Sequence, residues 1–264
     1  MQIATSADIA IEAVKNVGRY FLGEFRKAPV PTTPNDLMKT LTIIEEICLS
    51  MLKKDIDTEY GNIPWASDDE FDNNSQLAPA PYECYWLCDT MDGAIQYLQH
   101  IPGWTINLVL IEKGEPAFSI IYDPLTDECF HAEKYQGAYL NGRPIVVSEK
   151  KSAENMIAIL EYGHQLKSSN KWEKDLSSAL IRLTERFGVV RNYGPHGLQL
   201  AYIGAGRIDL FAQCDLDTHN WLAGILIAKE AGATILASDG KAWKWGDESI
   251  IVGTSEAVAI NFQK

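Results

Sequence analysis

Four short β-rich runs follow one another in the middle of the 264-residue chain, and they limit its possible folds more than any other feature. Turn pairs of the kind that joins antiparallel strands bound these runs, at Lys113-Gly114, Asp123-Pro124 and Asn141-Gly142. We therefore predict an antiparallel meander in this region. Its strands are expected at residues 106–111, 117–122, 128–132 and 137–140.

The chain after this meander alternates between strand-like and helix-like segments, without repeats or low-complexity linkers. Such alternation is typical of a layered α/β structure. The expected strands are residues 156–160, 189–192, 208–212 and 234–237, and a late strand at 249–252 would close the sheet. The expected helices are residues 171–186, 196–203 and 218–231.

Two helices are predicted before the meander. Residues 7–26 carry apolar side chains at four-residue steps, which is the pattern of an amphipathic helix. A basic, proline-rich connection over residues 25–34 leads to a second helix that reaches about Lys54. The start of this second helix is ambiguous, because residues 33–36 and 42–45 both carry N-cap patterns.

Composition limits the classes of protein to which the chain can belong. A hydrophobic content of 46% is enough to bury a core, as one large domain or as two closely joined halves. The formal net charge of −13 argues against binding to nucleic-acid backbones or anionic membranes, and no segment resembles a membrane span. The same charge would repel a phosphate ester, so a phosphate substrate would itself favour bound cations.

The N-terminal residues and the cysteines favour a cytoplasmic location. Residues 1–27 lack the continuous apolar core of a signal peptide and show helical spacing instead. The five cysteines are odd in number and include no CxxC pair. We therefore expect reduced, mostly buried thiols and no zinc site built from them.

Residues 86–93 read W-L-C-D-T-M-D-G and place two carboxylates three positions apart at the end of an apolar run. A strand that ends just before Asp89 would carry this residue at its tip, and Asp92 would follow beside it in the turn. Gly93 and Ala94 would then open a helix whose N–H groups face outward.

This arrangement suits a metal-dependent phosphate site, because carboxylates hold a divalent cation and a helix start holds an anion. Bound cations neutralise phosphoryl oxygens and activate water for the hydrolysis of a phosphate ester. The alternative is a capped turn without function, since aspartate and glycine are equally common in turns. The segment alone leaves both interpretations open.

Several ordered motifs along nearly the whole chain resemble the inositol monophosphatase-like family of Mg²⁺-dependent phosphatases. The motifs are D-x-x-D-G at 89–93, Y-D-P-x-x-D-E-x-F at 122–130, G-A-Y-L-N-G-R-P-I at 137–145, residues 200–209, and A-G-I-L-I-A-K-E-A-G at 223–232. The resemblance implies an α/β fold of mixed α+β type, a five-layered α-β-α-β-α sandwich that forms one domain over residues 1–264. Residues 1–150 would form an α+β half with the metal motif, and residues 151–264 an α/β half that completes the active site.

The resemblance also implies roles for the D-x-x-D-G motif. Up to three Mg²⁺ ions would lie between the halves, and a water activated by metal would attack phosphorus in line. Asp89 would bridge two ions, Asp92 would hold the second, and the Met91 carbonyl would join the first. The amides of Gly93 and Ala94 would hold the phosphate.

The acids that the family places before this motif are shorter here. The family has a Glu-Glu pair, and the nearest match is Asp68-Asp69, followed by Glu70. A shorter carboxylate still reaches an ion, directly or through water. We therefore expect Asp68 and Asp69 among the metal ligands, with Asp68, Asp89 and Asp92 as the catalytic carboxylates.

Three further departures from the family pattern fall in one small region. Asn220 replaces the last metal-binding aspartate, and its amide oxygen can coordinate Mg²⁺ without adding negative charge. Ala94 replaces a threonine whose hydroxyl helps to orient the attacking water, and Thr42 replaces the aspartate that partners this threonine. Loss of a water-orienting pair costs about 100- to 10,000-fold in rate, which would make the protein slow or inactive.

The resemblance places His196, Gln213 and His219 on the substrate side of the site. Either histidine would donate to phosphate or act as general acid for the leaving alcohol, or would serve as a hydrogen-bonded structural residue. Gln213 matches a glutamate that contacts substrate hydroxyls. Asp215 and Asp217 would replace lost charge, although a solvated acidic loop is the favoured interpretation.

The sequence therefore predicts Mg²⁺-dependent hydrolysis of a small phosphomonoester, which would be an inositol, sugar or related polyol phosphate. One alternative is a catalytically degenerate family member that binds a phosphorylated metabolite or a partner without turnover. A second alternative is a phosphatase like the 3'(2'),5'-bisphosphate nucleotidases. We expect a homodimer with a small phosphorylated metabolite as ligand, and neither nucleic acid nor membrane as partner.

Overall fold

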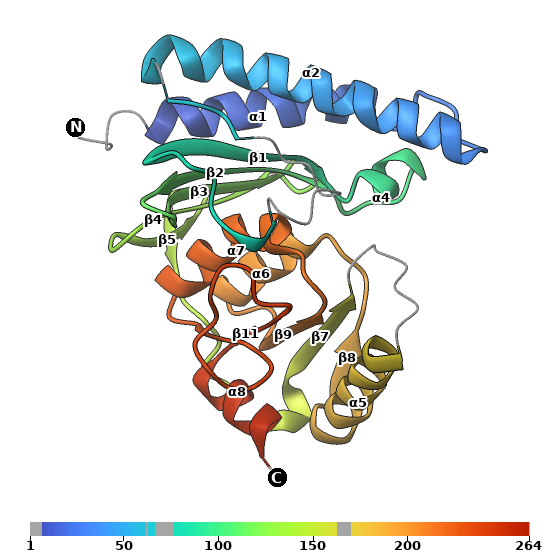
Figure 1. The fold of residues 1–264 in the computed structure, drawn as a ribbon, viewed down its shortest axis with the longest axis vertical. Coiled ribbons are helices and arrows are strands. Elements are labelled where there is room, and N and C mark those ends of the chain that lie inside the picture. The colour runs from blue at the N-terminus through green and yellow to red at the C-terminus, as the bar shows by residue number, and fades with distance from the viewer. Residues whose placement is uncertain (1–6, 62, 67–75, 163–169, 264) are drawn as a thin grey trace.

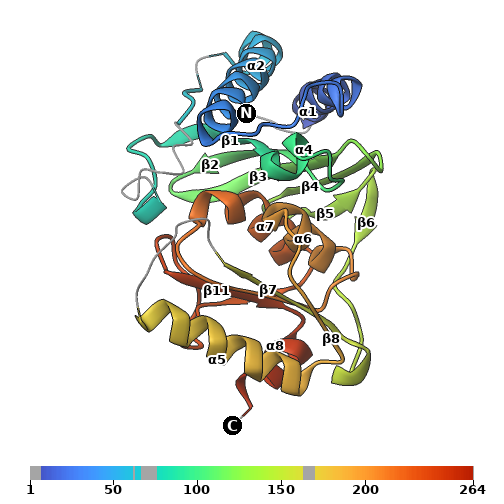
Figure 2. The ribbon, with the colours of Figure 1, turned by 90° about the vertical axis from the view of Figure 1, so that its right-hand side faces the viewer.

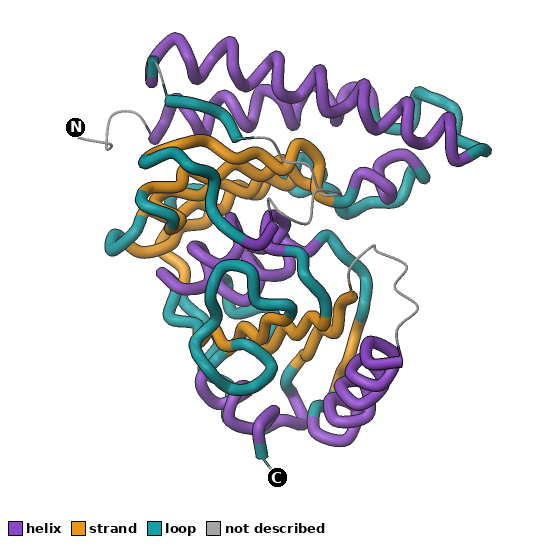
Figure 3. The backbone as a smooth tube through the Cα atoms, in the orientation of Figure 1, coloured by secondary structure: helices purple, strands orange, loops and turns teal. Residues whose placement is uncertain are grey.

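Five layers of secondary structure make up the protein in a computed structural model: helices, a sheet, helices, a second sheet and helices (Figure 1). The structure describes residues 7–61, 63–66, 76–162 and 170–263, with the backbone alone for 170–173. Figure 2 shows the layers from the side, and Figure 3 shows two blocks of strands with helices above, between and below them. The predicted five-layered sandwich is therefore confirmed.

The first sheet, which lies above the second in Figure 1, is the predicted meander with one more strand at each end. Its strands follow one another in sequence order, and every neighbouring pair is antiparallel. Short turns explain the order from β2 to β6, because they join adjacent antiparallel strands, whereas residues 93–104 form a longer connection from β1 to β2. The strands are β1 Cys84–Asp92, β2 Thr105–Glu112, β3 Glu115–Asp123, β4 Glu128–Glu133, β5 Gly137–Leu140 and β6 Arg143–Ile145.

Two helices, α1 Ala7–Glu24 and α2 Pro34–Tyr60, cover the outer face of this sheet. Thr33 is the N-cap of α2, because its hydroxyl oxygen accepts from the Asp36 N–H. This contact decides between the two predicted starts. The helix continues past its predicted end at Lys54, since its last turns still bury apolar side chains.

The second sheet contains β7 Ile157–Tyr162, β8 Val189–Arg191, β9 Leu210–Cys214, β10 Thr234–Leu236 and β11 Ser249–Gly253. Its order is β10-β11-β9-β7-β8, in which β7 pairs in parallel with β8 and β9, while β11 pairs antiparallel with β9 and β10. The late strand predicted at residues 249–252 therefore lies inside the sheet instead of closing it at an edge. Strand order of this kind depends on long-range pairing, which periodicity does not reveal.

Helices α6 His196–Gly204 and α7 Thr218–Glu230 form the middle layer, with one sheet on each side (Figure 2). Nearly all of their residues are buried, as expected for helices that solvent reaches on no face. The two helices approach closely at Gly224, where an added Cβ atom would lie 2.4 Å from Leu200 Cβ. This layer brings the starts of two helices into the interior of the protein.

Helices α5 Asn170–Arg186 and α8 Ser255–Phe262 cover the remaining face of the second sheet (Figure 1). The sequence analysis did not predict α8, whose N-cap Thr254 accepts from the Ala257 N–H through its hydroxyl oxygen. Among the described helices, none has the length and apolarity needed to cross a bilayer. The five cysteines are free thiols, as predicted.

Candidate active site

An irregularity in β1 places both carboxylates of the D-x-x-D-G motif on one face of the first sheet. The strand does not stop before Asp89 as predicted but runs to Asp92, with a bulge between these residues. In a regular strand, residues three apart point to opposite faces. Asp89 pairs with Asn107 and Asp92 pairs with Thr105, so three positions along β1 correspond to only two along β2. This bulge places both aspartates on the same face of the sheet.

Asn107 bridges the two carboxylates from the neighbouring strand. Its Nδ2 lies 3.3 Å from Asp89 Oδ2 and 3.1 Å from Asp92 Oδ2. Its Oδ1 accepts from the Thr105 hydroxyl at 2.8 Å, and this contact assigns the orientation of the amide. Sequence reasoning missed Asn107, because a lone asparagine in a strand has no signal until the pairing of β1 with β2 is known.

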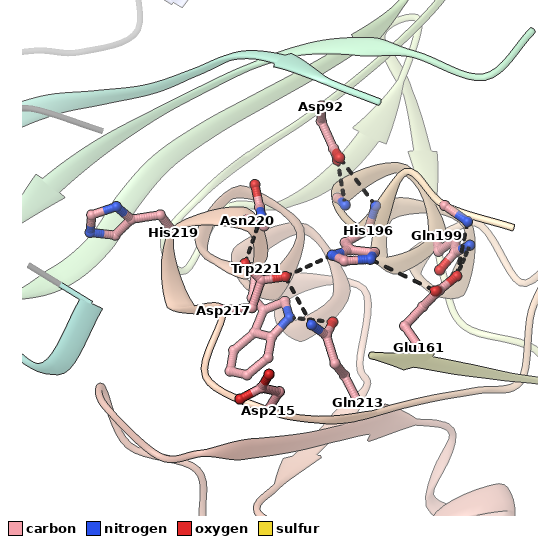
Figure 4. A network of polar contacts seen from close by, with 12 residues as sticks. Asp92, Glu161, His196, Gln199, Gln213, Asp215, Asp217, His219, Asn220 and Trp221 are labelled. Atoms are coloured by element: carbon pink, nitrogen blue, oxygen red, sulfur yellow. Dashed lines mark hydrogen bonds and ion pairs between the residues drawn. The ribbon is translucent and has the colours of Figure 1, made fainter. Parts of the chain in front are cut away.

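Asp92 also accepts the first N–H groups of α6. His196 N lies 3.3 Å from Asp92 Oδ1, and Gly197 N lies 2.7 Å from Asp92 Oδ2 (Figure 4). The unpaired N–H groups and the dipole of a helix start stabilise a carboxylate. Burial nevertheless raises the pKa of Asp92, while the charge of His196 and the N–H of Gly197 oppose this shift.

Glycine at position 197 leaves room for this contact. A Cβ atom on Gly197 would lie 2.7 Å from Asn107 Nδ2 and 3.0 Å from Asp92 Oδ2. A side chain at this position would therefore displace the Asn107 amide or the Asp92 carboxylate.

The motif ends in a helix start, as predicted. Gly93 has a φ of +86° and is the N-cap of the short helix α4 Ala94–Leu98. This backbone conformation favours glycine, and a Cβ atom there would lie 2.6 Å from the Gly103 carbonyl oxygen. The two amides that the resemblance assigns to phosphate thus lie at the beginning of a helix.

His196 lies in a buried acidic cluster. Its Nδ1 is 2.8 Å from Asp217 Oδ2, and its Nε2 is 3.8 Å from Glu161 Oε2. Burial lowers the pKa of this imidazole, but the hydrogen bond and charge of Asp217, together with the charges of Asp92 and Glu161, raise it to about 9. His196 is therefore an internal cation at neutral pH, a form that suits each of the roles that the sequence left open.

Glu161 is a buried carboxylate that the sequence analysis did not single out. It stands near the end of β7 and accepts from the backbone N–H groups of Tyr193 and Gly194. The amides of Asn192 and Gln199 donate to it as well, at 2.8 and 2.9 Å. An acidic residue inside the apolar run I-A-I-L-E-Y is the signal that could have found it.

Asp217 accepts hydrogen bonds from three side chains. Besides His196, Gln213 donates through Nε2 at 2.8 Å and Asn220 through Nδ2 at 2.6 Å (Figure 4). Burial raises the pKa of Asp217, but the hydrogen bond and charge of His196 and the two amide donors lower it overall. The predicted solvated acidic loop is wrong, since Asp215 and Asp217 are only 8% and 7% exposed. The donors around Asp217 compensate for its burial.

Asn220 and Gln213 belong to the same network. The Asn220 amide oxygen points away from Asp217 and toward the strands of the first sheet (Figure 4). Gln213 accepts from Trp221 Nε1 at 2.8 Å through Oε1, so both ends of its amide are engaged. The protein's own side chains therefore hold Gln213, which the resemblance assigns to substrate.

His219 points away from His196 (Figure 4). Its backbone N–H donates to Gln76 Oε1 at 2.9 Å. Its ring meets the Trp245 ring edge to face, with centroids 6.4 Å apart. The structure thus separates the two histidines that the resemblance groups together.

The remaining residues of the sequence analysis lie in different surroundings. Met91 lies in the bulge of β1 with its side chain buried in the core, and the predicted role of its carbonyl stays a prediction. Thr42 is exposed, and its hydroxyl donates to the Met38 carbonyl of the same helix. Asp68 and Asp69 lie outside the described residues. Within the described ranges, no group of three or more His, Cys, Asp or Glu side chains is arranged to hold a metal ion.

A family model described as the inositol monophosphatase family matches residues 3–262. The chain belongs to this family. Membership places the protein, at a coarse level, among phosphatase-like proteins.

Two curated relatives illustrate how far the similarity extends. The chain is 31% identical over 156 residues to the fructose-1,6-bisphosphatase/inositol-1-monophosphatase of Thermotoga maritima, covering 59% of this chain and 57% of the relative. It is 27% identical over 164 residues to the Nus factor SuhB of Escherichia coli, covering 62% and 60%. The chain thus spans less than two thirds of the length of these relatives.

Solved structures of inositol monophosphatases share the fold. The inositol monophosphatase from Anabaena superposes with a TM-score of 0.81 at 22% identity, covering 99% of this chain and 95% of that one. The extragenic suppressor protein suhB from Bartonella henselae gives a TM-score of 0.78 at 20% identity, covering 97% and 98%. At these identities the superpositions establish the fold alone.

Proposed function

We propose that this protein hydrolyses a small phosphomonoester, an inositol, sugar or related polyol phosphate, with the help of Mg²⁺. The observation that carries the proposal is the bulge in β1, which turns Asp89 and Asp92 to one buried face beside the start of α6. A protein with a net charge of −13 needs cations to accept an anionic ester, and this pair is the place where they would bind.

The donors at this site fit a hard divalent cation. Asp89 and Asp92 supply carboxylate oxygens, Asn220 turns an amide oxygen toward the same sheet, and the Met91 carbonyl belongs to the bulge. Oxygen donors of this kind suit Mg²⁺, which binds few protein ligands and keeps several waters. Asp92 receives its hydrogen bonds from neutral N–H groups, and the nearby charge of His196 offsets only part of the burial that raises the pKa of Asp92. A bound cation would stabilise its charged form further.

Each part of the site has a separate task in this proposal. Mg²⁺ supplies charge neutralisation of the phosphoryl oxygens and an activated water when it is bound. Asp89 and Asp92 hold the cation, and Asn107 keeps their carboxylates on one face. The N–H groups of Gly93 and Ala94 donate to the phosphate at the start of α4.

Binding without turnover is the second candidate function. Ala94 brings no hydroxyl to the start of α4, Asn220 brings no charge, and Thr42 donates its hydroxyl to its own helix. The water-orienting pair that the family uses is therefore missing from these positions. The Escherichia coli relative carries the name Nus factor SuhB, which does not name a phosphatase activity.

Phosphate release tests the proposal. The protein is incubated with Mg²⁺ or with EDTA and with a panel of inositol, sugar and nucleotide phosphates, including 3',5'-bisphosphates. We expect Mg²⁺-dependent release from a sugar or inositol phosphate and loss of this release in Asp89→Asn. Thermal stabilisation by a panel member without release, even at high protein concentration, would support binding alone. Calorimetry that detects no Mg²⁺ binding with the ligand saturating would overturn both the metal site and the phosphatase proposal.

A further inference from the structure

A cavity of about 480 Å³ lies on the flank of α7. Its walls come from the turns between β2 and β3 and between β4 and β5, the end of α7, β10, and the loop between β10 and β11. None of the residues of the candidate active site lines it. We call it the tryptophan–lysine pocket, after Lys134, Lys229, Trp243, Lys244 and Trp245. Its volume lies within the range of small-molecule sites.

The charge of this pocket is opposite to that of the whole protein. Three lysines and one glutamate line it, whereas the chain carries a net charge of −13. Lys134 Nζ lies 2.5 Å from Glu115 Oε2 and neutralises it. Neither Lys229 nor Lys244 forms an ion pair with another described residue. The lysines therefore outnumber the acid by two in this lining, and this positive excess attracts an anion.

The walls between these lysines are apolar and aromatic. Ile225, Leu226 and Ile235 contribute aliphatic surface, and Trp243 and Trp245 contribute indole rings. The ring of Trp243 packs edge-on against Trp221 with centroids 6.3 Å apart, and Trp245 packs against His219. These contacts hold the indoles in place before any ligand arrives, so ligand binding does not have to order them.

Among the described residues, neither indole N–H group has a hydrogen-bond partner. Nε1 of Trp243 and Nε1 of Trp245 are buried, and neither contacts an acceptor in the described part of the chain. Because both nitrogens are enclosed, the indoles offer the pocket their ring surfaces, and the lysines decide the charge of a ligand.

We propose that the tryptophan–lysine pocket binds a small organic anion with a flat apolar body, such as an aromatic sulfonate or carboxylate. The flat body lies against the indole and aliphatic walls, and the anionic group pairs with Lys229 and Lys244. This site is distinct from the Asp89–Asp92 site and does not depend on phosphatase activity.

The test uses 1-anilinonaphthalene-8-sulfonate, an aromatic sulfonate whose fluorescence rises in apolar sites. Titration followed by fluorescence and by calorimetry should give one saturable site with a dissociation constant on the order of 10 µM. The double variant Lys229→Gln/Lys244→Gln should weaken binding at least about tenfold. The control Lys27→Gln/Lys39→Gln changes two exposed lysines that do not line the pocket. It alters the net charge by the same amount and should leave binding unchanged.

Two further measurements define the ligand and the site. N-phenyl-1-naphthylamine has the same rings without the sulfonate, so it should bind more weakly and should not respond to the lysine variants. Asp89→Asn should bind the sulfonate as the unmodified protein does. The proposal is overturned if no saturable site appears, if both double variants have the same effect, or if Asp89→Asn removes binding. Circular dichroism of every variant confirms folding, because partly unfolded protein also binds this dye.

Discussion

Asp92, which accepts the first N–H groups of α6, and Asp217, the N-cap of α7, are equally buried, yet their pKa values shift in opposite directions. Each residue is 7% exposed. Burial raises the pKa of Asp92, whose hydrogen bonds come from the Asn107 amide and from backbone N–H groups. The pKa of Asp217 is lowered despite burial, because the protonated His196 donates to it.

The charge of His196 acts on both aspartates, but His196 donates a hydrogen bond to Asp217 alone. Direct contact with a cation therefore compensates a buried carboxylate better than neutral donors with a cation farther away. We expect Asp217 to stabilise the structure, and we expect the proposed Mg²⁺ to stabilise the charged form of Asp92. The four predictions below test this contrast.

Asp92→Asn should cause the largest change in activity. The amide keeps the size of the carboxylate but removes the charge that holds the cation, so phosphate release should fall by about 10³-fold. The free energy of unfolding should fall by only about 1–3 kcal/mol, because the amide oxygen keeps one accepting position while the amide nitrogen faces a donor at the other. Asp239→Asn, at an exposed aspartate paired with Lys241, is the control and should keep full activity. Equal loss of stability and activity in Asp92→Asn would contradict the proposed division of roles.

His196→Gln should show the opposite profile, with a large loss of stability. It removes the cation beside Asp217 and leaves a buried charge without compensation, which costs about 3–5 kcal/mol in urea unfolding. Combining it with Asp217→Asn should restore part of this loss, since the two changes remove both charges. Strict additivity of the two single effects would show that the pair is not coupled.

Stability should fall as the solution becomes alkaline. The pKa of His196 is about 9 in the folded protein, against about 6.5 for a free histidine, so folding binds its proton more tightly. The resulting contribution of about 3 kcal/mol is complete below pH 6.5 and disappears as the pH rises through 9. Urea unfolding at pH 6, 7.5 and 9 measures it. The same series in His196→Gln should lack this component, and an identical slope in both proteins would refute the assignment.

Asn220→Asp should give the smallest effect and should depend on Mg²⁺. The Asn220 amide donates to Asp217 at 2.6 Å, so a carboxylate in its place would face a like charge. We expect a loss of about 1–3 kcal/mol in EDTA and recovery in Mg²⁺, since the new carboxylate is also a better cation ligand. Differential scanning calorimetry with and without Mg²⁺ measures the change. An equal loss under both conditions would argue against a cation near this position.

Most helices and strands could be predicted from the sequence, because periodicity and turn pairs act over a few residues. The meander strands and α6 were predicted to within a few residues of their observed bounds. The place of β11 inside its sheet was not, since pairing between β9 and β11 joins residues that lie far apart in the chain. Glu161 and Asn107 were missed for the same reason, as neither residue forms a motif with its sequence neighbours.

By itself, the sequence determined the alternation of elements, the D-x-x-D-G motif and the resemblance to a phosphatase family. Only the tertiary structure decided what each acid does. Asp92 accepts hydrogen bonds from the backbone N–H groups of His196 and Gly197, which lie more than a hundred residues later in the sequence. A single bulge in β1 turns Asp89 to the same face as Asp92. The charge environment of a buried carboxylate depends on the groups within a few ångströms of it, and folding brings most of those groups from elsewhere in the chain.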